Sequence, residues 1–293
     1  TVEGALRMIS REELWNLLLT NTRLGDEVSE LNDGECTCSQ RLDILAKQAG
    51  INERLNAPLF VSIDSPKDLP KALVHRCLYV IRLGQWPGGK ARFMICKAHS
   101  DYKEEAITLK DLEKAPEVRI EPSRLSKWVM LLASRLRGES ITTLAAVLLV
   151  RALERHDYID MIPSVRFGSV RFSFKPSRAS RTYTYWGQVE IDAVLGGIRI
   201  FALEAKSERK SSLFKYKIAF SALALTSIIK RPVYPLLAFM LREDENTTIK
   251  TALLYPPTTP NEAQGAYVIE EMRPVKRAEL SVPSFTTDSP HFI

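Results

Sequence analysis

Two neighbouring stretches in the second half of the chain have the apolar patterns of β-strands. From Gln188 to Leu195, apolar side chains stand at every second position, which is the pattern of a strand with one buried face. After Gly196-Gly197, the run from Ile198 to Leu203 is mostly apolar, as in a strand that is covered on both sides. These patterns predict two strands that are joined at the glycines.

The stretches around this pair alternate between helix and strand. The apolar run from Ile141 to Leu153 and the stretch from Ser211 to Ile229 have the length and spacing of helices. Val233 to Leu241 and Thr248 to Leu254 are short apolar runs of the kind found in buried strands. The order predicts an α/β fold with a mixed central sheet flanked by helices.

The first half of the chain predicts a mixed α+β domain. Ser10 begins a helix with a capping-box sequence, and Arg41 to Asn52 resembles the first helix and glycine turn of a helix-turn-helix. Cys77 to Leu83 and Ala91 to Lys97 predict a glycine-rich hairpin, so the domain is compatible with the winged-helix type. The next stretch, with Pro58, makes a poor recognition helix, and an ordinary helix pair is the alternative.

Three charged side chains interrupt the paired strands. Asp192 lies in the first strand, and Glu204 and Lys206 share one face at the end of the second. Unpaired charge is costly to bury, so we expect these groups to emerge together at a working edge. Carboxylates bind Mg²⁺, and a neighbouring lysine can orient or deprotonate a water and offset transition-state charge. The set predicts metal-dependent phosphodiester hydrolysis.

On these residues and their strand context, residues 140–240 resemble the PD-(D/E)XK nuclease superfamily, which contains the type II restriction endonucleases. The resemblance implies a restriction-endonuclease-like sheet. It implies that Asp192, Glu204 and the Ala205 carbonyl bind Mg²⁺, for which Mn²⁺ can substitute. It also implies that Asp192, Glu204 and Lys206 are the catalytic residues.

The chain departs from the family pattern at two points. Ile191 stands where proline is frequent, and the apolar run of the preceding helix has only Glu139 before it and Glu154 near its end. The accessory candidates for metal binding or water orientation are therefore Glu190, Gln188, Glu154 and Glu139. Glu190 and Gln188 share the strand face of Asp192, and an ordinary structural role is the alternative for both.

The turn between the strands decides whether the two acids can meet. A two-residue loop at Gly196-Gly197 would pair Asp192 with Phe201 and leave Asp192 and Glu204 on opposite faces. A shared metal therefore requires a loop of odd length or a bulge, where a glycine at positive φ is favoured. In the alternative, Asp192 caps a strand end, and Glu204 and Lys206 form a surface ion pair.

Basic residues concentrate around this segment. The chain has a net charge of +6, and residues 166–217 contain 11 basic and 4 acidic side chains. Basic side chains attract phosphates irrespective of sequence, so the concentration predicts a nucleic-acid partner, with DNA preferred. Most of the aromatic residues interleaved with them are expected in the core. The candidates for DNA binding are Arg178, Arg181, Arg209, Lys210, Lys215 and Lys217.

The expected function is Mg²⁺-dependent endonucleolytic cleavage of DNA, with type II restriction of duplex DNA as the first choice. Residues 1–122 would then recognise DNA or a second subunit, 123–280 would form the nuclease domain, and 281–293 would be a tail. Cutting both strands predicts a homodimer. The alternatives are a structure-specific repair or recombination nuclease, and a non-catalytic nucleic-acid-binding protein with a nuclease-like fold.

Other features of the sequence bear on the compartment of the protein and on its cofactors. No stretch reaches the roughly 18 uncharged apolar residues of a membrane span, and residues 1–8 contain no signal-peptide core. No glycine loop of the P-loop type is present. We therefore expect a cytoplasmic enzyme without a membrane partner or a nucleotide cofactor. The four cysteines are expected to be free thiols, with a structural zinc site as the alternative.

Overall fold

The computed structural model describes residues 9–52, 55–86, 90–120, 139–155, 159–206, 211–243 and 246–283. The expected domain boundary at 122/123 lies outside these residues, as do Arg209, Lys210 and the end of the chain from residue 284.

The first half combines short helices with a hairpin. Its helices are α1 (Arg11–Asn21), α2 (Leu24–Ser29), α3 (Leu42–Gln48), α4 (Ala57–Val61), α5 (Lys71–Val74) and α6 (Leu109–Lys114). Its strands are β1 (Gln40–Arg41), β2 (Leu78–Trp86), β3 (Lys90–Lys97) and β4 (Ala106–Thr108). As expected, the Ser10 side chain caps α1 by accepting from the Glu13 N–H at 3.1 Å.

The second half follows the predicted alternation. Its helices are α8 (Glu139–Glu154) and α9 (Lys215–Ile229). Its strands are β5 (Asp160–Lys175), β6 (Tyr183–Gly196), β7 (Ile200–Lys206), β8 (Ser212–Phe214), β9 (Val233–Glu243), β10 (Asn246–Tyr255), β11 (Gln264–Val268) and β12 (Arg273–Pro283). The tail expected from residue 281 is corrected at its start, because Ser281 to Pro283 still pair with β10.

The central sheet is mixed, as predicted. Its main path runs β1-β3-β2-β6-β7-β9-β10-β12, and β5 pairs with β6 and with β11. β6 is antiparallel to both β5 and β7, whereas β7 and β9 are parallel and are connected through α9. The strands that carry Asp192 and Glu204, β6 and β7, therefore lie within the order α8-β5-β6-β7-β8-α9-β9.

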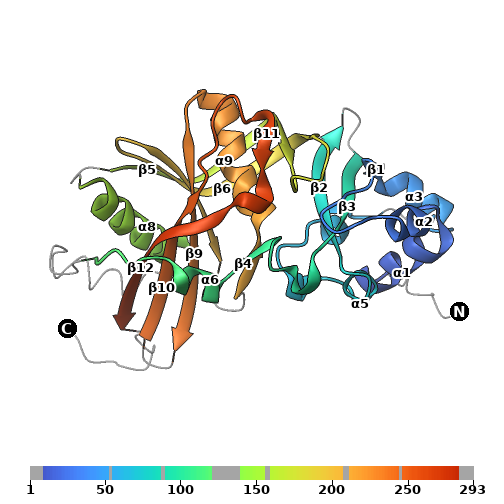
Figure 1. Cartoon of the computed structure of the whole chain (residues 1–293), viewed down its shortest axis with the longest axis horizontal. Helices are drawn as coiled ribbons and strands as arrows, with labels where there is room; N and C mark the ends of the chain where they lie inside the picture. Colours follow the sequence, from blue (N-terminus) through green and yellow to red (C-terminus); the bar gives the residue numbers. More distant parts are fainter. Residues whose placement is uncertain are drawn as a thin grey trace, which may run out of the picture.

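Two helices cover opposite faces of these strands. Ala193, Leu195 and Leu203 pack with buried residues of α8, and Ala202 on the other face packs with buried residues of α9. Figure 1 shows α8 and α9 on different sides of the strands, with the N-terminal helices gathered at the other end of the molecule. Within the described residues, no helix has the length and apolar character of a membrane span.

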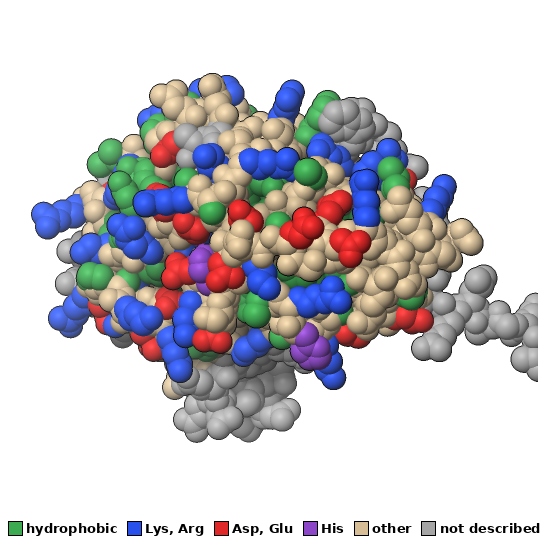
Figure 2. Space-filling model, turned by 45° about the vertical axis from the view of Figure 1, so that its right-hand side comes forward, with side chains coloured by type: hydrophobic (Ala, Val, Ile, Leu, Met, Phe, Trp, Pro, Cys, Tyr) green, Lys and Arg blue, Asp and Glu red, His purple; other side chains and the backbone are tan. Residues whose placement is uncertain are grey.

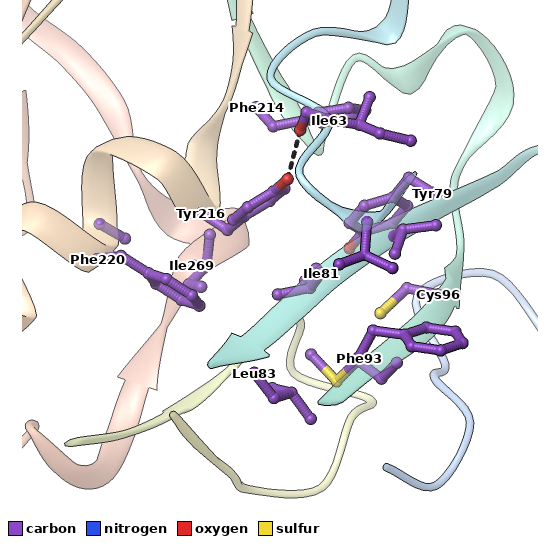
Figure 3. Packing of buried hydrophobic residues seen from close by; sticks show 14 of the residues in the cluster. Ile63, Tyr79, Ile81, Leu83, Phe93, Cys96, Phe214, Tyr216, Phe220 and Ile269 are labelled. Carbon is purple, nitrogen blue, oxygen red and sulfur yellow. Dashed lines mark hydrogen bonds between the residues drawn. The ribbon is translucent and has the colours of Figure 1, made fainter. Parts of the chain in front are cut away.

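The two halves share one hydrophobic core. A single cluster of buried side chains extends from Leu14 to Met272, and β4 pairs with β8 across the halves. Figure 3 shows part of this packing, where Phe214 and Tyr216 meet Tyr79 and Ile63. The Tyr79 and Phe214 rings are stacked with centroids 5.4 Å apart. The first half is therefore packed directly against the helix and strands beside the candidate site.

The β2–β3 hairpin belongs to the central sheet and does not stand free as a wing. β2 meets β6 at Gly84, which pairs with Trp186. Gly84 has a φ of +85°, and a Cβ there would lie 2.0 Å from the Trp186 carbonyl oxygen. Only glycine permits both the backbone conformation and this close approach.

The helix-turn-helix candidate is incomplete. Gly50 has a φ of +83° after α3, as a glycine turn requires, but the next described helix, α4, has only five residues and buries Phe60 and Val61. The expectation of four free thiols is also corrected, because Cys36 and Cys96 form a disulfide while Cys38 and Cys77 are free.

Candidate active site

The β6–β7 turn has the odd length that a shared site requires. Gly196 pairs with Ile200, which leaves a three-residue loop, Gly197 to Arg199. Neither glycine of the turn has a positive φ, so that part of the expectation is wrong. Residue 197 is a glycine for a steric reason instead. A Cβ there would lie 2.1 Å from the Glu154 carboxylate.

Glu154 organises this turn and is not a ligand candidate. Its carboxylate accepts hydrogen bonds from the Ile198 and Arg199 N–H groups at 2.8 and 2.9 Å, and its Oε1 lies 3.1 Å from the Arg199 Nε. Glu204 lies five residues beyond Arg199, roughly 16 Å away at the rise of a strand. Glu154 is therefore at the wrong end of the strands for a shared metal.

The register places the two acids opposite one another. The pairs run from Leu195↔Phe201 to Ala193↔Leu203, where the pairing ends. Extending this register by one residue sets Asp192 opposite Glu204, on the same face. The Asp192 Oδ2 accepts a hydrogen bond from the Ala205 N–H at 2.6 Å. The N–H and C=O of one strand residue point to the same edge, so the Ala205 carbonyl also faces Asp192.

Glu204 and Lys206 line an opening beside β6, whereas Asp192 and Ala205 are not among its lining residues. Pairing with β7 ends at Ala193, and pairing with β2 occurs at Trp186. Between these points, β6 faces a cavity of about 390 Å³. The cavity is lined by residues of both halves, among them Ser62, Asp64, Arg82, Arg166, Gln188, Glu190, Glu204, Lys206, Lys217 and Ser221.

A chain of charged contacts runs along one wall of the cavity. The Lys206 Nζ lies 2.8 Å from the Glu204 Oε1 and 4.0 Å from the Asp64 Oδ2. The Lys217 Nζ lies 2.8 Å from the Asp64 Oδ1. The Ser221 hydroxyl of α9 donates to the Glu204 Oε2 at 3.1 Å. Glu204 is only 8% exposed, so its negative charge is held by these donors rather than by bulk water.

The charge of Lys206 is stabilised in this setting. Burial lowers the pKa of Lys206, but the carboxylates of Glu204, Asp64 and Asp192 outweigh burial and raise the pKa above its usual value. Lys206 is therefore an ammonium group at neutral pH. It forms the ion pair with Glu204 that the alternative expects, but the two side chains are only 19% and 11% exposed.

The donor set fits a hard divalent cation. Two opposed carboxylates and the Ala205 carbonyl offer oxygen ligands, which Mg²⁺ takes together with water and phosphate oxygens. Among the described residues, no three Asp, Glu, His or Cys side chains gather closely enough to hold a metal by themselves. A bound ion would therefore draw its other ligands from the carbonyl, water and substrate.

Of the remaining accessory candidates, two lie beside the site and the side chain of the third is not described. Glu190 is exposed and pairs with Arg166 at 2.9 Å, and both line the cavity with Gln188. Glu190 and Gln188 thus lie beside the site, and the ion pair of Glu190 is with Arg166 rather than with Lys206. Glu139 begins α8, and its side chain lies outside the described part of the chain.

The DNA-binding candidates are less available than their sequence suggests. Lys215 is buried and donates to the Glu270 carbonyl at 2.6 Å, and burial lowers the pKa of its ammonium group, so a role on the phosphate-facing surface is wrong. Arg178 pairs with Glu271 at 2.7 Å, and Arg181 lies over the Tyr183 ring. Figure 2 shows acidic side chains interspersed among basic ones on the face that it presents. Only Lys217, of the described candidates, lines the cavity.

Most interleaved aromatic residues belong to the core, as expected. The rings of Phe172, Tyr185 and Phe220 pack with centroids 5.0 to 5.1 Å apart. These rings pack against one another beneath the cavity and do not present a free surface on which bases could stack.

Three site residues have no signal in the local sequence. Asp64 and Arg82 come from the first half, and Ser221 comes from within the apolar helix α9. The segment around Asp64 has neither a strand nor a helix period, so only the folded chain reveals its place beside Lys206.

No family model, curated protein or solved structure matches this chain.

Proposed function

We propose that the chain is a divalent-metal-dependent nuclease that hydrolyses DNA phosphodiester bonds. The observation that carries the proposal is the β6–β7 register, whose extension by one residue brings Asp192 opposite Glu204, together with the contact between Lys206 and Glu204. The order α8-β5-β6-β7-β8-α9-β9, with β7 parallel to β9, supports a restriction-endonuclease-like fold.

Each residue has a separate part in the proposed reaction. Asp192, Glu204 and the Ala205 carbonyl would hold Mg²⁺, whose chemistry there would be to polarise the phosphate and to lower the pKa of a bound water. Lys206 donates a hydrogen bond to the phosphate and offsets the negative charge that develops there. Ser221 holds the Glu204 carboxylate in place from α9. Arg82 and Arg166 add positive charge to the cavity wall.

Duplex DNA is the proposed substrate. A single site cuts one strand, so cleavage of a duplex requires two copies and the proposal includes a homodimer. Discrete fragments from a plasmid would support restriction. Cleavage confined to junction or flap DNA would support the structure-specific alternative.

The first prediction concerns the acids and the lysine. Asp192→Asn and Lys206→Ala should each lower the rate of plasmid cleavage in Mg²⁺ at least about 100-fold, because each removes a group that meets the reacting phosphate or its metal. Cleavage is followed on gels with the full chain, with a chelator as the metal control.

The matched control is Lys250→Ala. Lys250 lies on a strand of the same sheet, is 21% exposed against 19% for Lys206, and pairs with Glu113 at 2.7 Å. Its variant should cleave like the parent. An active parent with unaffected Asp192 and Lys206 variants would refute the assignment of the catalytic residues. Metal-independent DNA binding without cleavage would refute the proposed enzymatic activity.

A further inference from the structure

One acidic residue of the first half reaches into the candidate site. Asp64 lines the cavity beside Glu204 and Lys206, and its two carboxylate oxygens face two different lysines. Lys206 comes from β7 and Lys217 from α9. Asp64 is thus the group that both ammonium groups share.

The backbone around Asp64 is held by contacts with β8 and the first turn of α9. The Phe214 N–H donates to the Asp64 carbonyl at 2.8 Å, and the Ser65 and Ser212 hydroxyls lie 2.7 Å apart in a buried contact. The buried Tyr216 hydroxyl donates to the Ile63 carbonyl, the dashed contact in Figure 3. Every one of these partners is in β8 or the first turn of α9. Residues 63–65 therefore move with the same element that carries Lys217.

The Asp64 carboxylate lies between two positively charged side chains. Lys206 and Lys217 are like charges that converge on one cavity wall, with side chains 19% and 23% exposed. In such a half-buried setting like charges repel more strongly than in water, and a shared carboxylate holds them in one arrangement. Glu204 holds Lys206 from its other side, whereas Asp64 is the only carboxylate with an ion pair to Lys217 among the described residues.

We propose that Asp64 is a positioning residue, which holds the ammonium groups of Lys206 and Lys217 side by side so that both face a phosphate entering the cavity. This inference rests on the proposed nuclease function for its consequence in the reaction. It makes the first half part of the active site, in addition to any role in recognition.

Asp64→Asn tests the proposal because asparagine keeps the size of the side chain and leaves the backbone contacts of residues 63–65 intact. We expect kcat for DNA cleavage to fall about 10- to 100-fold with little change in KM, since displaced reactive groups cost rate rather than binding. Asp64→Glu, which restores the charge, should recover part of kcat. Glu113→Gln, at the Lys250 ion pair, is the control and should behave as the parent.

A second readout does not need cleavage. The rate at which each lysine is acylated by an amine reagent, measured by mass spectrometry of the full chain, should rise for Lys206 and Lys217 in Asp64→Asn and stay constant for Lys250. Should Asp64→Asn melt below the parent, Lys217→Gln breaks the same ion pair without touching residues 63–65. It should lower kcat, and Lys206 should be acylated no faster than in the parent, because the Asp64 carboxylate stays beside it and a repelling charge is gone.

Each result is decisive. An unchanged kcat in Asp64→Asn would overturn the proposal. An increased kcat would also overturn it, because it would mean that Asp64 hinders the substrate. If the parent does not cleave DNA, the proposed function fails, and the acylation rates alone decide whether Asp64 holds the two lysines.

Discussion

Gly197 and Glu154 share one small space at the β6–β7 turn, and the turn sets the register on which the site depends. A methyl group at residue 197 would lie 2.1 Å from the Glu154 carboxylate, which accepts from two backbone N–H groups of the loop. A larger side chain would therefore push away the group that holds the loop together.

Gly197→Ala should destabilise the protein by about 1–3 kcal/mol, the range for inserting a group into filled space. The measurement is the free energy of unfolding in urea. Gly168→Ala is the matched control, since a Cβ added to Gly168 on β5 would meet no heavy atom within 4 Å, and this variant should lose little stability. Equal losses in both variants would contradict the role assigned to the turn.

His99 gives the first half a pH-dependent contact. Its Nδ1 lies 2.9 Å from the Glu105 Oε1, and that hydrogen bond raises the pKa of His99 against the opposing effect of burial, with Asp33 and Glu104 adding to the rise. A raised pKa in the folded state means that the charged form stabilises the fold. The contribution is complete below the unfolded pKa of about 6.5 and disappears as the pH rises through the folded pKa.

The stability lost in His99→Gln should therefore be larger in mildly acidic than in alkaline solution. Urea unfolding of parent and variant across about pH 5 to pH 9 measures it. A difference that does not change with pH would mean that the His99–Glu105 contact contributes nothing through its charge.

At the scale of elements, the sequence predicts the paired strands best. The alternation from Gln188 to Leu195 and the apolar run that follows correspond to β6 and β7. The first is recognisable because apolar side chains recur at every second position in a strand with one buried face. The requirement that Asp192 and Glu204 share a face also predicts the odd loop. The sequence could not show why the loop forms, since Glu154 comes from the preceding helix.

Other elements leave no periodic signal. β8 has three residues, whereas the sequence from Ser211 onwards predicts helix throughout. Lys215 follows directly and looks like a surface lysine, but its stem is buried and its ammonium group reaches the Glu270 carbonyl, 55 residues away. Asp64 and Lys206 are likewise distant in sequence, and contacts of this kind follow from packing rather than from local pattern.

At the scale of the whole molecule, the shared core links the two halves mechanically. Phe214 of β8 is fully buried, stacks on Tyr79 of β2 and lies 6.3 Å from the Tyr102 ring. The halves therefore share one of the two buried clusters, while the second cluster, around α8, is built from buried residues of the second half. Because the shared cluster includes Ala252 and Leu254 of β10, the halves are expected to unfold together.

Phe214→Ala should cost about 3–5 kcal/mol, the usual range for removing a buried phenylalanine. Hydrogen exchange should show protection falling together in β3 and β10, which lie in different halves. Leu59→Ala, at a side chain that is 57% exposed, should change the stability by less than about 0.5 kcal/mol. Retained protection in β10 would show that the second half is stable alone.

The docking of residues 63–65 onto β8 and α9 also has a consequence for synthesis. During translation the segment with Asp64 leaves the ribosome long before Lys206, Lys217 and Ser221 exist to receive it. A nascent chain would therefore carry only part of the candidate site, which would be complete only after distant parts of the polypeptide had met.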